Sequence, residues 1–211
     1  MTKIGITMRV IETQGYKESR DALAHDWYDF MEYAFKDVAW MPIPNIGTNV
    51  VDYVKKWGVN SFIFSGGNDI GSSPARDETE RSLLEYALKD KLPVFGVCRG
   101  LQFIHHYFGG SLSECDPQIH VAKQHTVLLN DQISKTLGAA KEYKVNSYHN
   151  FGIRGRDLDD RLQITAATDG EWVEGIEVIG SPIRAVMWHP ERDKPYRETD
   201  KKLMLNTLLN G

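Results

Sequence analysis

Short runs of apolar residues alternate with longer stretches of mixed character along the first half of the chain. In the longer stretches the apolar residues recur every three or four positions, as Trp27, Phe30 and Met31 do, which predicts amphipathic helices. The shorter runs predict buried strands. We expect strands at residues 3–8, 38–41, 61–64 and 92–97, and helices at residues 21–35, 50–57, 77–89 and 101–108. This alternation is typical of βαβ units and a parallel sheet.

The pattern changes after residue 110, where strands follow one another with a single further helix. The strands are expected at residues 125–129, 143–146, 162–167, 172–179 and 183–188, and the helix at 199–209. The sequence therefore predicts an α/β fold with an open, mostly parallel sheet flanked by helices, and with antiparallel edge strands in the C-terminal half. A length of 211 residues suits one such domain, spanning residues 1–211.

Composition excludes several classes of protein. Lys and Arg number 25 against 29 Asp and Glu, so the net charge of -4 gives no sign of a surface for a nucleic-acid polymer. No apolar run approaches the roughly 18 residues that span a membrane, and the early charges of Lys3 and Arg9 argue against a signal peptide. Two cysteines cannot build a disulfide scaffold, so we expect a cytoplasmic protein with free thiols.

The most informative segment is 96–100, GVCRG, which follows an apolar strand and precedes a predicted helix. Small residues two positions before and two positions after Cys98 permit the sharp strand-to-helix turn of a nucleophile elbow. This turn places the thiol at a helix N-terminus, where the helix dipole favours the thiolate. Buried structural cysteines are also common, but this context favours a nucleophile. Cys115 lacks such a context and is expected to be a packing residue.

A base and its orienter follow the last predicted strand. A cysteine nucleophile needs an imidazole to take its proton, and the imidazole needs a third group to fix its tautomer. His189 and Glu191 are two residues apart, so in extended backbone they face the same way, and Pro190 keeps His189 out of the helical region. The alternative is a surface histidine beside a solvated glutamate. Together with the elbow, the pair predicts a triad of Cys98, His189 and Glu191.

Acyl transfer also needs N–H groups directed at the developing oxyanion. The backbone N–H of Arg99 directly follows the nucleophile. Gly66 and Gly67 end a neighbouring strand, and glycine there lets the backbone turn a second N–H inward. The same two glycines also suit an ordinary tight turn.

Four segments in this order carry a family resemblance. They are residues 65–69 (SGGND), 96–102 (GVCRGLQ), 145–149 (VNSYH) and 188–191 (WHPE). Together they resemble the class I glutamine amidotransferase-like superfamily, in its γ-glutamyl hydrolase (peptidase C26-like) branch. The resemblance implies a flavodoxin-like sheet and a thioester mechanism, in which Cys98 attacks a γ-glutamyl carbonyl, His189 moves protons and Glu191 orients His189.

The resemblance also implies binding roles. The N–H groups of Gly67 and Arg99 would hold the oxyanion. The pocket for the α-amino and α-carboxylate groups would be lined by Gln102, Asn146, Ser147, Tyr148 and His149. Two departures from glutaminase subunits look like stand-alone γ-glutamyl amide hydrolases: Arg99 stands where leucine or isoleucine is usual, and the glycine pair is followed by Asn-Asp rather than Pro.

The N-terminal stretch 9–23, with Trp27, more loosely resembles a subgroup from bacterial surface-polysaccharide (capsule) gene clusters. It implies a γ-glutamyl nucleotide amidate, such as γ-glutamyl-CDP-amidate, as the substrate. Arg9 lies at the end of the first predicted strand, Tyr16 and Arg20 follow in a loop and early helix folded over the pocket, and Arg192 and Lys194 flank Glu191. These side chains would bind the phosphates and the base, since arginine makes bidentate, charge-assisted contacts with phosphate. The alternative is that these side chains lie on the surface and bind no ligand.

Two other functions stay open. One is a glutaminase subunit that supplies ammonia to a synthase, and the other is a non-enzymatic redox or regulatory protein on the same fold. The pairing of His189 with Glu191 counts against a sensor thiol. Cys115, His120, His125 and His149 match no usual zinc spacing, so no metal or cofactor is expected. The expected partner is a small-molecule γ-glutamyl substrate, with no membrane and no nucleic acid, and a homodimer is compatible with the sequence.

Overall fold

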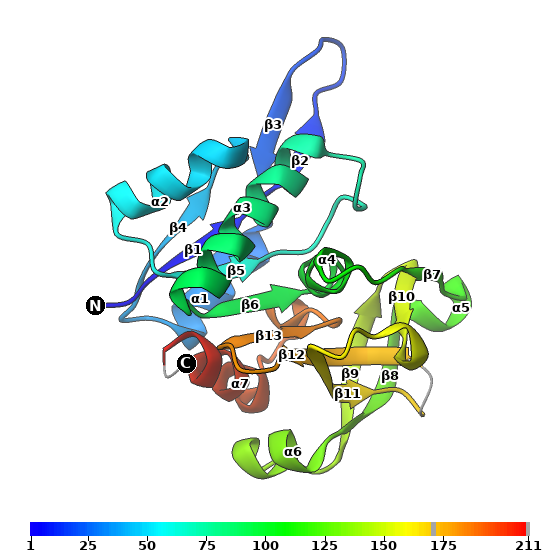
Figure 1. Ribbon diagram of the computed structural model, residues 1–211. Helices are drawn as coiled ribbons and strands as arrows, with labels where there is room; N and C mark the ends of the chain where they lie inside the picture. The colour runs from blue at the N-terminus through cyan, green and yellow to red at the C-terminus, as the bar shows by residue number, and fades with distance from the viewer. Residues whose placement is uncertain (170–171, 210–211) are drawn as a thin grey trace.

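The computed structural model describes residues 1–169 and 172–209. Within these residues, 11 strands form one sheet whose main path runs β4-β1-β5-β6-β13-β12-β11-β8-β9. The strands from β4 to β13 pair in parallel. Those from β13 to β9 pair antiparallel. The predicted α/β class, with a mostly parallel sheet and antiparallel strands in the C-terminal half, is confirmed (Figure 1).

The parallel part alternates strands with helices, as the sequence predicts. Its strands are β1 (Lys3–Thr7), β4 (Ala39–Ile43), β5 (Ser61–Phe64), β6 (Val94–Val97) and β13 (Ile183–Val186), and its helices are α1 (His25–Ala34), α2 (Val50–Trp57), α3 (Pro74–Asp90), α4 (Arg99–Tyr107) and α7 (Glu198–Leu208). Local signals set several ends. Pro74 opens α3 at the first helical position, and Gly58 ends α2 in the left-handed conformation.

The antiparallel part contains more elements than its pattern predicts. It consists of β7 (Ser113–Glu114), α5 (Pro117–His120), β8 (Val121–Leu129), α6 (Asp131–Leu137), β9 (Glu142–Tyr148), β10 (Phe151–Arg154), β11 (Leu162–Ala167) and β12 (Trp172–Val178). Off the main path, β10 pairs with β12 and with β7. The hydrophobic pattern of the sequence does not predict four of these elements, namely β7, α5, α6 and β10. The side chain of Asn130 accepts a hydrogen bond from the backbone N–H of Ile133 at 2.9 Å and so caps α6.

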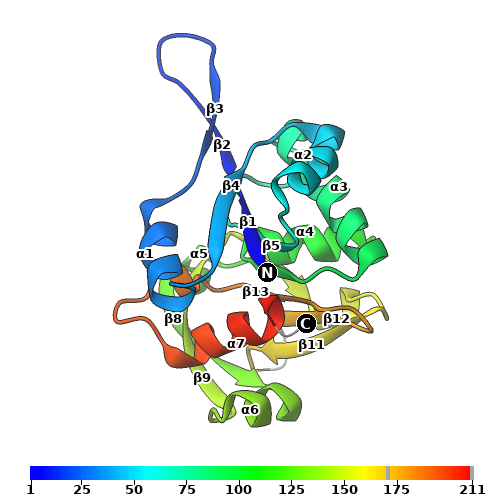
Figure 2. The same cartoon turned by 90° about the vertical axis from the view of Figure 1, so that its left-hand side faces the viewer.

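Two apolar layers cover the two faces of the sheet. Phe62 and Phe64 of β5 pack toward α2, α3 and α4, whereas Ile63 packs with residues of α1 and α7. This alternation follows from the two-residue period of a strand, and both faces are buried because helices cover each side. Figure 2 shows α1 and α3 on opposite sides of the parallel strands.

The segment between β1 and α1 departs from the prediction. Residues 9–22 form an antiparallel hairpin of β2 (Arg9–Glu12) and β3 (Ser19–Ala22) instead of a loop and an early helix. The hairpin projects from the body of the protein in both views (Figures 1 and 2). Helix α1 accordingly begins at His25 rather than at residue 21. Among the helices that the structure describes, none is long and apolar enough to cross a lipid bilayer.

Candidate active site

Cys98 occupies the turn between β6 and α4, with φ of 52° and ψ of -101°. A positive φ is unusual for a side-chain-bearing residue and is characteristic of strained functional turns. The glycines on either side leave room for the turn. A Cβ atom at Gly100 would lie 2.3 Å from the carbonyl oxygen of Phe64, and one at Gly96 would lie 2.8 Å from the Cβ of Ala185. The geometry of a nucleophile elbow is therefore present.

His189 and Glu191 follow β13, the strand beside β6, and both are buried. The Nδ1 atom of His189 lies 2.7 Å from Oε1 of Glu191. The side-chain amide of Asn146 clamps the backbone of His189: its Oδ1 accepts from the N–H at 2.9 Å, and its Nδ2 donates to the carbonyl at 2.8 Å. Because Glu191 engages Nδ1, the Nε2 atom is the ring nitrogen left for Cys98.

Cys98 and His189 perturb each other's protonation. Burial raises the pKa of the Cys98 thiol, but the positive charge of His189 and its hydrogen bond outweigh burial and bring that pKa below its usual value. Burial lowers the pKa of His189, whereas the charges of Glu191 and Cys98 raise it, to about 9. Both directions favour a thiolate beside an imidazolium, which is the reactive form of a cysteine nucleophile.

A cavity of about 190 Å³ opens over Cys98 and His189. It lies beyond the carboxyl ends of β1, β5, β6 and β13, where ligands bind in open α/β sheets. Four of its residues, Asn68, Asp69, Asn150 and Phe151, are not among the predicted site residues. The first two lie within the segment 65–69, and the last two directly follow the segment 145–149. The full lining is Arg9, Gly67, Asn68, Asp69, Cys98, Arg99, Gln102, Tyr148, His149, Asn150, Phe151, His189 and Arg192.

The turn after β5 is held by Arg76, a fully buried residue of α3. Its guanidinium donates to the carbonyl oxygens of Ser65 at 2.6 Å, Gly66 at 3.1 Å and Gly67 at 3.0 Å. In a trans peptide the C=O and the next N–H point in opposite directions. The contact to the Gly66 carbonyl therefore turns the N–H of Gly67 away from Arg76.

Arg99 lines the cavity, but its side chain is directed into a buried ion cluster. It pairs with Glu80 and Asp77 of α3, and Glu80 also pairs with Arg76 at 3.0 Å and accepts from the Thr7 hydroxyl at 2.7 Å. Burial raises the pKa of Glu80, but the charges of Arg99 and Arg76 outweigh it and lower that pKa. The side chain of Arg99 thus anchors the first turn of α4 to α3. The i,i+4 spacing of Arg76 and Glu80 is the signal in the sequence that could have indicated this cluster.

Three of the five residues predicted for glutamyl binding line the cavity, namely Gln102, Tyr148 and His149. The amide of Gln102 donates to the carbonyl of Phe151 at 2.8 Å, which fixes its orientation. Asn146 and Ser147 require correction, because neither lines the cavity.

The side chains of Asn146 and Ser147 both form hydrogen bonds to backbone groups instead. Asn146 holds the backbone of His189, and the hydroxyl of Ser147 donates to the carbonyl of His120 at 2.6 Å. Because neighbouring side chains of a strand face opposite ways, Ser147 faces away from Tyr148, whereas Asn146 shares the face of Tyr148 but is held by the backbone of His189.

Two basic residues reach the cavity, Arg9 and Arg192. A Cβ atom at Gly67 would lie 2.2 Å from the guanidinium of Arg9, so only glycine leaves room for that side chain. The guanidinium of Arg192 lies over the ring of Tyr148, 4.7 Å from its centroid. Both arginines therefore border the space above Cys98.

Tyr16 and Arg20, predicted to close over the pocket, do not line it. They belong to the projecting hairpin, where Arg20 pairs with Glu18 and donates to the Tyr16 hydroxyl at 2.8 Å. The prediction is wrong because the segment pairs as two strands and is directed away from the body. Trp27 is also unavailable for stacking on a base, since it is buried in the core.

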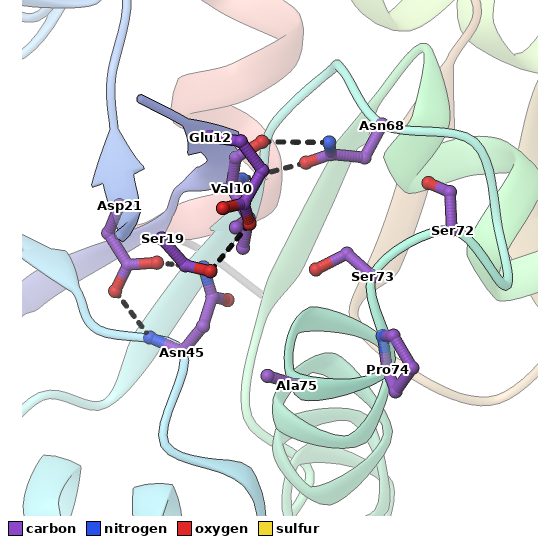
Figure 3. A pocket seen from close by; sticks show the side chains of 10 residues that line it. All are labelled: Val10, Glu12, Ser19, Asp21, Asn45, Asn68, Ser72, Ser73, Pro74 and Ala75. Carbon is purple, nitrogen blue, oxygen red and sulfur yellow. Dashed lines mark hydrogen bonds between the residues drawn. The ribbon is translucent and has the colours of Figure 1, made fainter. Parts of the chain in front are cut away.

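A second cavity, of about 420 Å³, lies at the base of the hairpin (Figure 3). Asn68 ties the hairpin to the turn after β5, since its amide donates to the carbonyl of Val10 at 2.9 Å and accepts from the N–H of Val10 at 2.8 Å. The described residues that line this cavity include two acidic ones, Glu12 and Asp21. None of the described lining residues has a basic side chain. The space is therefore unsuited to phosphates.

Comparisons with known proteins show the family to which the chain belongs. Residues 3–191 match the model of the Peptidase C26 family. The chain is 33% identical over 200 residues to γ-glutamyl-CDP-amidate hydrolase of Campylobacter jejuni, which covers 90% of each chain. It is 31% identical over 144 residues to γ-glutamyl-γ-aminobutyrate hydrolase of Escherichia coli, covering 59% of this chain and 56% of that one.

Solved structures show the same fold at lower identity. The glutaminase domain of Trypanosoma brucei CTPS with bound acivicin has a TM-score of 0.71 at 14% identity, covering 100% of this chain and 94% of that chain. A glutamine amidotransferase from Thermotoga maritima has a TM-score of 0.65 at 13% identity, covering 96% and 80%. The fold is thus that of the class I glutamine amidotransferases. Within that class, the chain belongs to the Peptidase C26 family, which makes it a hydrolase.

Proposed function

We propose that the protein cleaves γ-glutamyl amide bonds through a thioester on Cys98, with His189 as the acid–base and Glu191 as its orienter. The observation that carries the proposal is a thiol on a strained elbow whose pKa is lowered by a buried imidazole, which is itself bound by a carboxylate at 2.7 Å. The names of the relatives, which specify γ-glutamyl substrates, support the choice of the acyl group.

The reaction has two halves. The thiolate of Cys98 attacks the γ-carbonyl carbon, and the N–H groups of Arg99 and Gly67 stabilise the oxyanion. As the C–N bond breaks, the imidazolium of His189 donates its proton to the leaving nitrogen. Water then gives a proton to the neutral imidazole and attacks the thioester, so that glutamate leaves and the thiolate–imidazolium pair is restored.

The glutamyl group would bind over Gln102, Tyr148 and His149. Burial lowers the pKa of His149, but contacts with the Cys115 sulfur and Glu174 outweigh it and raise the pKa to about 10. A positive His149 in the cavity wall complements the α-carboxylate of a glutamyl group by charge.

We also propose that the leaving group carries phosphate, as in a γ-glutamyl nucleotide amidate formed during surface-polysaccharide modification. Ammonia or an uncharged amine would need no cations at the cavity rim, whereas Arg9 and Arg192 both border it. Arginine suits phosphate oxygens because its guanidinium makes bidentate, charge-assisted hydrogen bonds. The 33% identity to a γ-glutamyl-CDP-amidate hydrolase supports this substrate class.

The test measures glutamate release from glutamine, γ-glutamyl-aminobutyrate and a γ-glutamyl nucleotide amidate. We expect the nucleotide amidate to have the highest kcat/KM. Arg9→Ala and Arg192→Ala should each lower kcat/KM for it by about 10- to 100-fold, the usual cost of losing a hydrogen bond to a charged group, while changing glutamine hydrolysis little. Cys98→Ala should abolish turnover of all three substrates.

The matched control is Lys194→Ala, because Lys194 pairs with Asp29 at 2.9 Å and lies outside the cavity lining. It should leave the kcat/KM of every substrate unchanged. Equal losses on glutamine and on the nucleotide substrate in the arginine variants would contradict the phosphate assignment. A preference for glutamine would point instead to a glutaminase subunit.

A further inference from the structure

A buried cluster of side chains that could ligate a metal ion includes His149, but its other members do not line the cavity over Cys98. It gathers residues from separate segments of the antiparallel part: Cys115 after β7, His120 at the end of α5, His125 in β8, His149 after β9 and Glu174 in β12. His120, His149, Cys115 and Glu174 are all at most 6% exposed. The spacing of these residues along the chain predicts no metal site, yet the fold brings them together.

Two overlapping groups within the cluster have ligand atoms within 4.8 Å of one another. One is Cys115, His120 and His149, and the other is His120, His125 and Glu174. Ligands of a tetrahedral ion, each at about 2.1 Å, lie about 3.4 Å apart. Side-chain rotations that close up to about 1.4 Å would bring either group from the 4.8 Å limit to that distance.

The second group holds most of the unbonded atoms. Among the described residues, both ring nitrogens of His125, both carboxylate oxygens of Glu174 and Nδ1 of His120 are buried without a hydrogen-bond partner. The nearest approaches are 3.3 Å from His125 Nε2 to Glu174 Oε2 and 3.5 Å from His149 Nε2 to Glu174 Oε1. These two contacts are ion pairs, whereas Nδ1 of His120 and Nδ1 of His125 have neither a hydrogen bond nor an ion pair among the described residues. Buried polar atoms without a partner destabilise a fold, so their concentration at one point needs a cause.

We infer that His120, His125 and Glu174 bind a divalent transition-metal ion, and that the ion is Zn²⁺. Two imidazoles and one carboxylate, with a water in the fourth position, form a recurrent zinc ligand set. The ion would satisfy one nitrogen of each histidine and one oxygen of Glu174, and the second oxygen would stay with His149. It would also fasten the short helix α5 to β8 and β12.

The first group is the weaker candidate because two of its side chains, Cys115 and His149, already contact each other. Nδ1 of His149 lies 3.0 Å from the carbonyl of Phe151 and 3.7 Å from the sulfur of Cys115. Ligation through that nitrogen would break the contact to Phe151.

The experiment measures zinc in the whole protein with the catalytic thiol removed. The Cys98→Ala protein is used because a thiolate beside an imidazole would itself bind zinc. It is purified without a polyhistidine tag, equilibrated with Zn²⁺, dialysed against buffer and assayed by elemental mass spectrometry. We expect about one zinc per chain. His125→Ala and Glu174→Gln should each remove it, and Cys115→Ser should retain it.

The control is His106→Ala on α4, an exposed histidine whose loss should leave the zinc content unchanged. A second measurement does not depend on whether the variants fold. Zinc X-ray absorption of the Cys98→Ala protein should show nitrogen and oxygen neighbours at about 2.0–2.1 Å and no sulfur near about 2.3 Å. Absence of bound zinc, or a sulfur neighbour together with zinc loss in Cys115→Ser, would overturn the assignment.

Discussion

Replacing Glu191 by Gln tests whether the carboxylate activates the thiol through His189. The substitution keeps the size of the side chain and a hydrogen-bond acceptor for Nδ1, but it removes the negative charge. Because the imidazolium loses its counter-charge, the pKa of His189 should fall. The pKa of Cys98 should rise in turn, since a neutral imidazole no longer stabilises the thiolate.

The size of the effect follows from the pKa of His189, which is about 9 instead of the ordinary 6.5. A difference of about 2.5 pH units corresponds to about 3 kcal/mol in favour of the imidazolium. Glu191 is the largest of the contributions that raise this pKa, ahead of Cys98. Its removal should therefore withdraw most of that stabilisation and reduce the thiolate population at pH 6 by about 10- to 100-fold.

The assay is the rate of iodoacetamide alkylation of Cys98 against pH, followed by peptide mass spectrometry to separate it from Cys115. In the unmodified protein the rate should be high from acidic pH upward, because the thiolate–imidazolium pair persists up to the His189 pKa of about 9. In Glu191→Gln the rise should move to higher pH. Glu85→Gln, at an exposed position of α3, serves as the control. Superimposable profiles for Glu191→Gln and the unmodified protein would refute the proposed link.

Three further substitutions test the packing around the site. Burial raises the pKa of Asp200 to about 6 from 3.8, so its charge destabilises the fold above pH 6 by up to about 3 kcal/mol and costs nothing below pH 3.8. In calorimetry, Asp200→Asn should raise Tm more at pH 8 than at pH 4.5, and an equal rise at both would contradict this. Glu80→Gln removes the buried charge that Arg76 and Arg99 share and leaves Arg99 with Asp77 alone, so it should cost about 3–5 kcal/mol in urea unfolding, where a loss below about 1 kcal/mol would count against the ion cluster. Gly100→Ala should lower both Tm and kcat, because its Cβ atom would lie 2.3 Å from the carbonyl oxygen of Phe64. An unchanged Tm would show that the turn at Cys98 accommodates a Cβ atom at this position.

The parallel half of the fold is predictable because its signals are local. Buried parallel strands are short and uniformly apolar, and helices such as α2 carry their own stop signal at Gly58. The elbow at Cys98 is equally local, since the glycines that permit it lie two residues away. The antiparallel half depends on pairing between distant segments, which periodicity cannot specify, and so the small elements there were missed.

The candidate site shows the same division. The positions of Cys98 and His189 follow from which residues end neighbouring strands. The Arg99 side chain is buried against Glu80 because α3 packs on α4. No short sequence motif predicts that packing. The hairpin that carries Arg20 is mispredicted for a related reason: its residues are mostly polar and exposed, so no hydrophobic period marks them as strands.

The neighbouring positions of β6 and β13 have a consequence for how the thiol becomes reactive during synthesis. The two strands pair side by side, although Cys98 and His189 stand 91 residues apart in sequence. A chain emerging from the ribosome therefore carries an ordinary, weakly acidic thiol until residues 183–189 have been made and β13 has inserted between β6 and β12. Closing so long a loop is among the slower steps of folding. Rapid alkylation at acidic pH would thus report that β13 is in place, because the pKa of the Cys98 thiol falls only when His189 lies beside it.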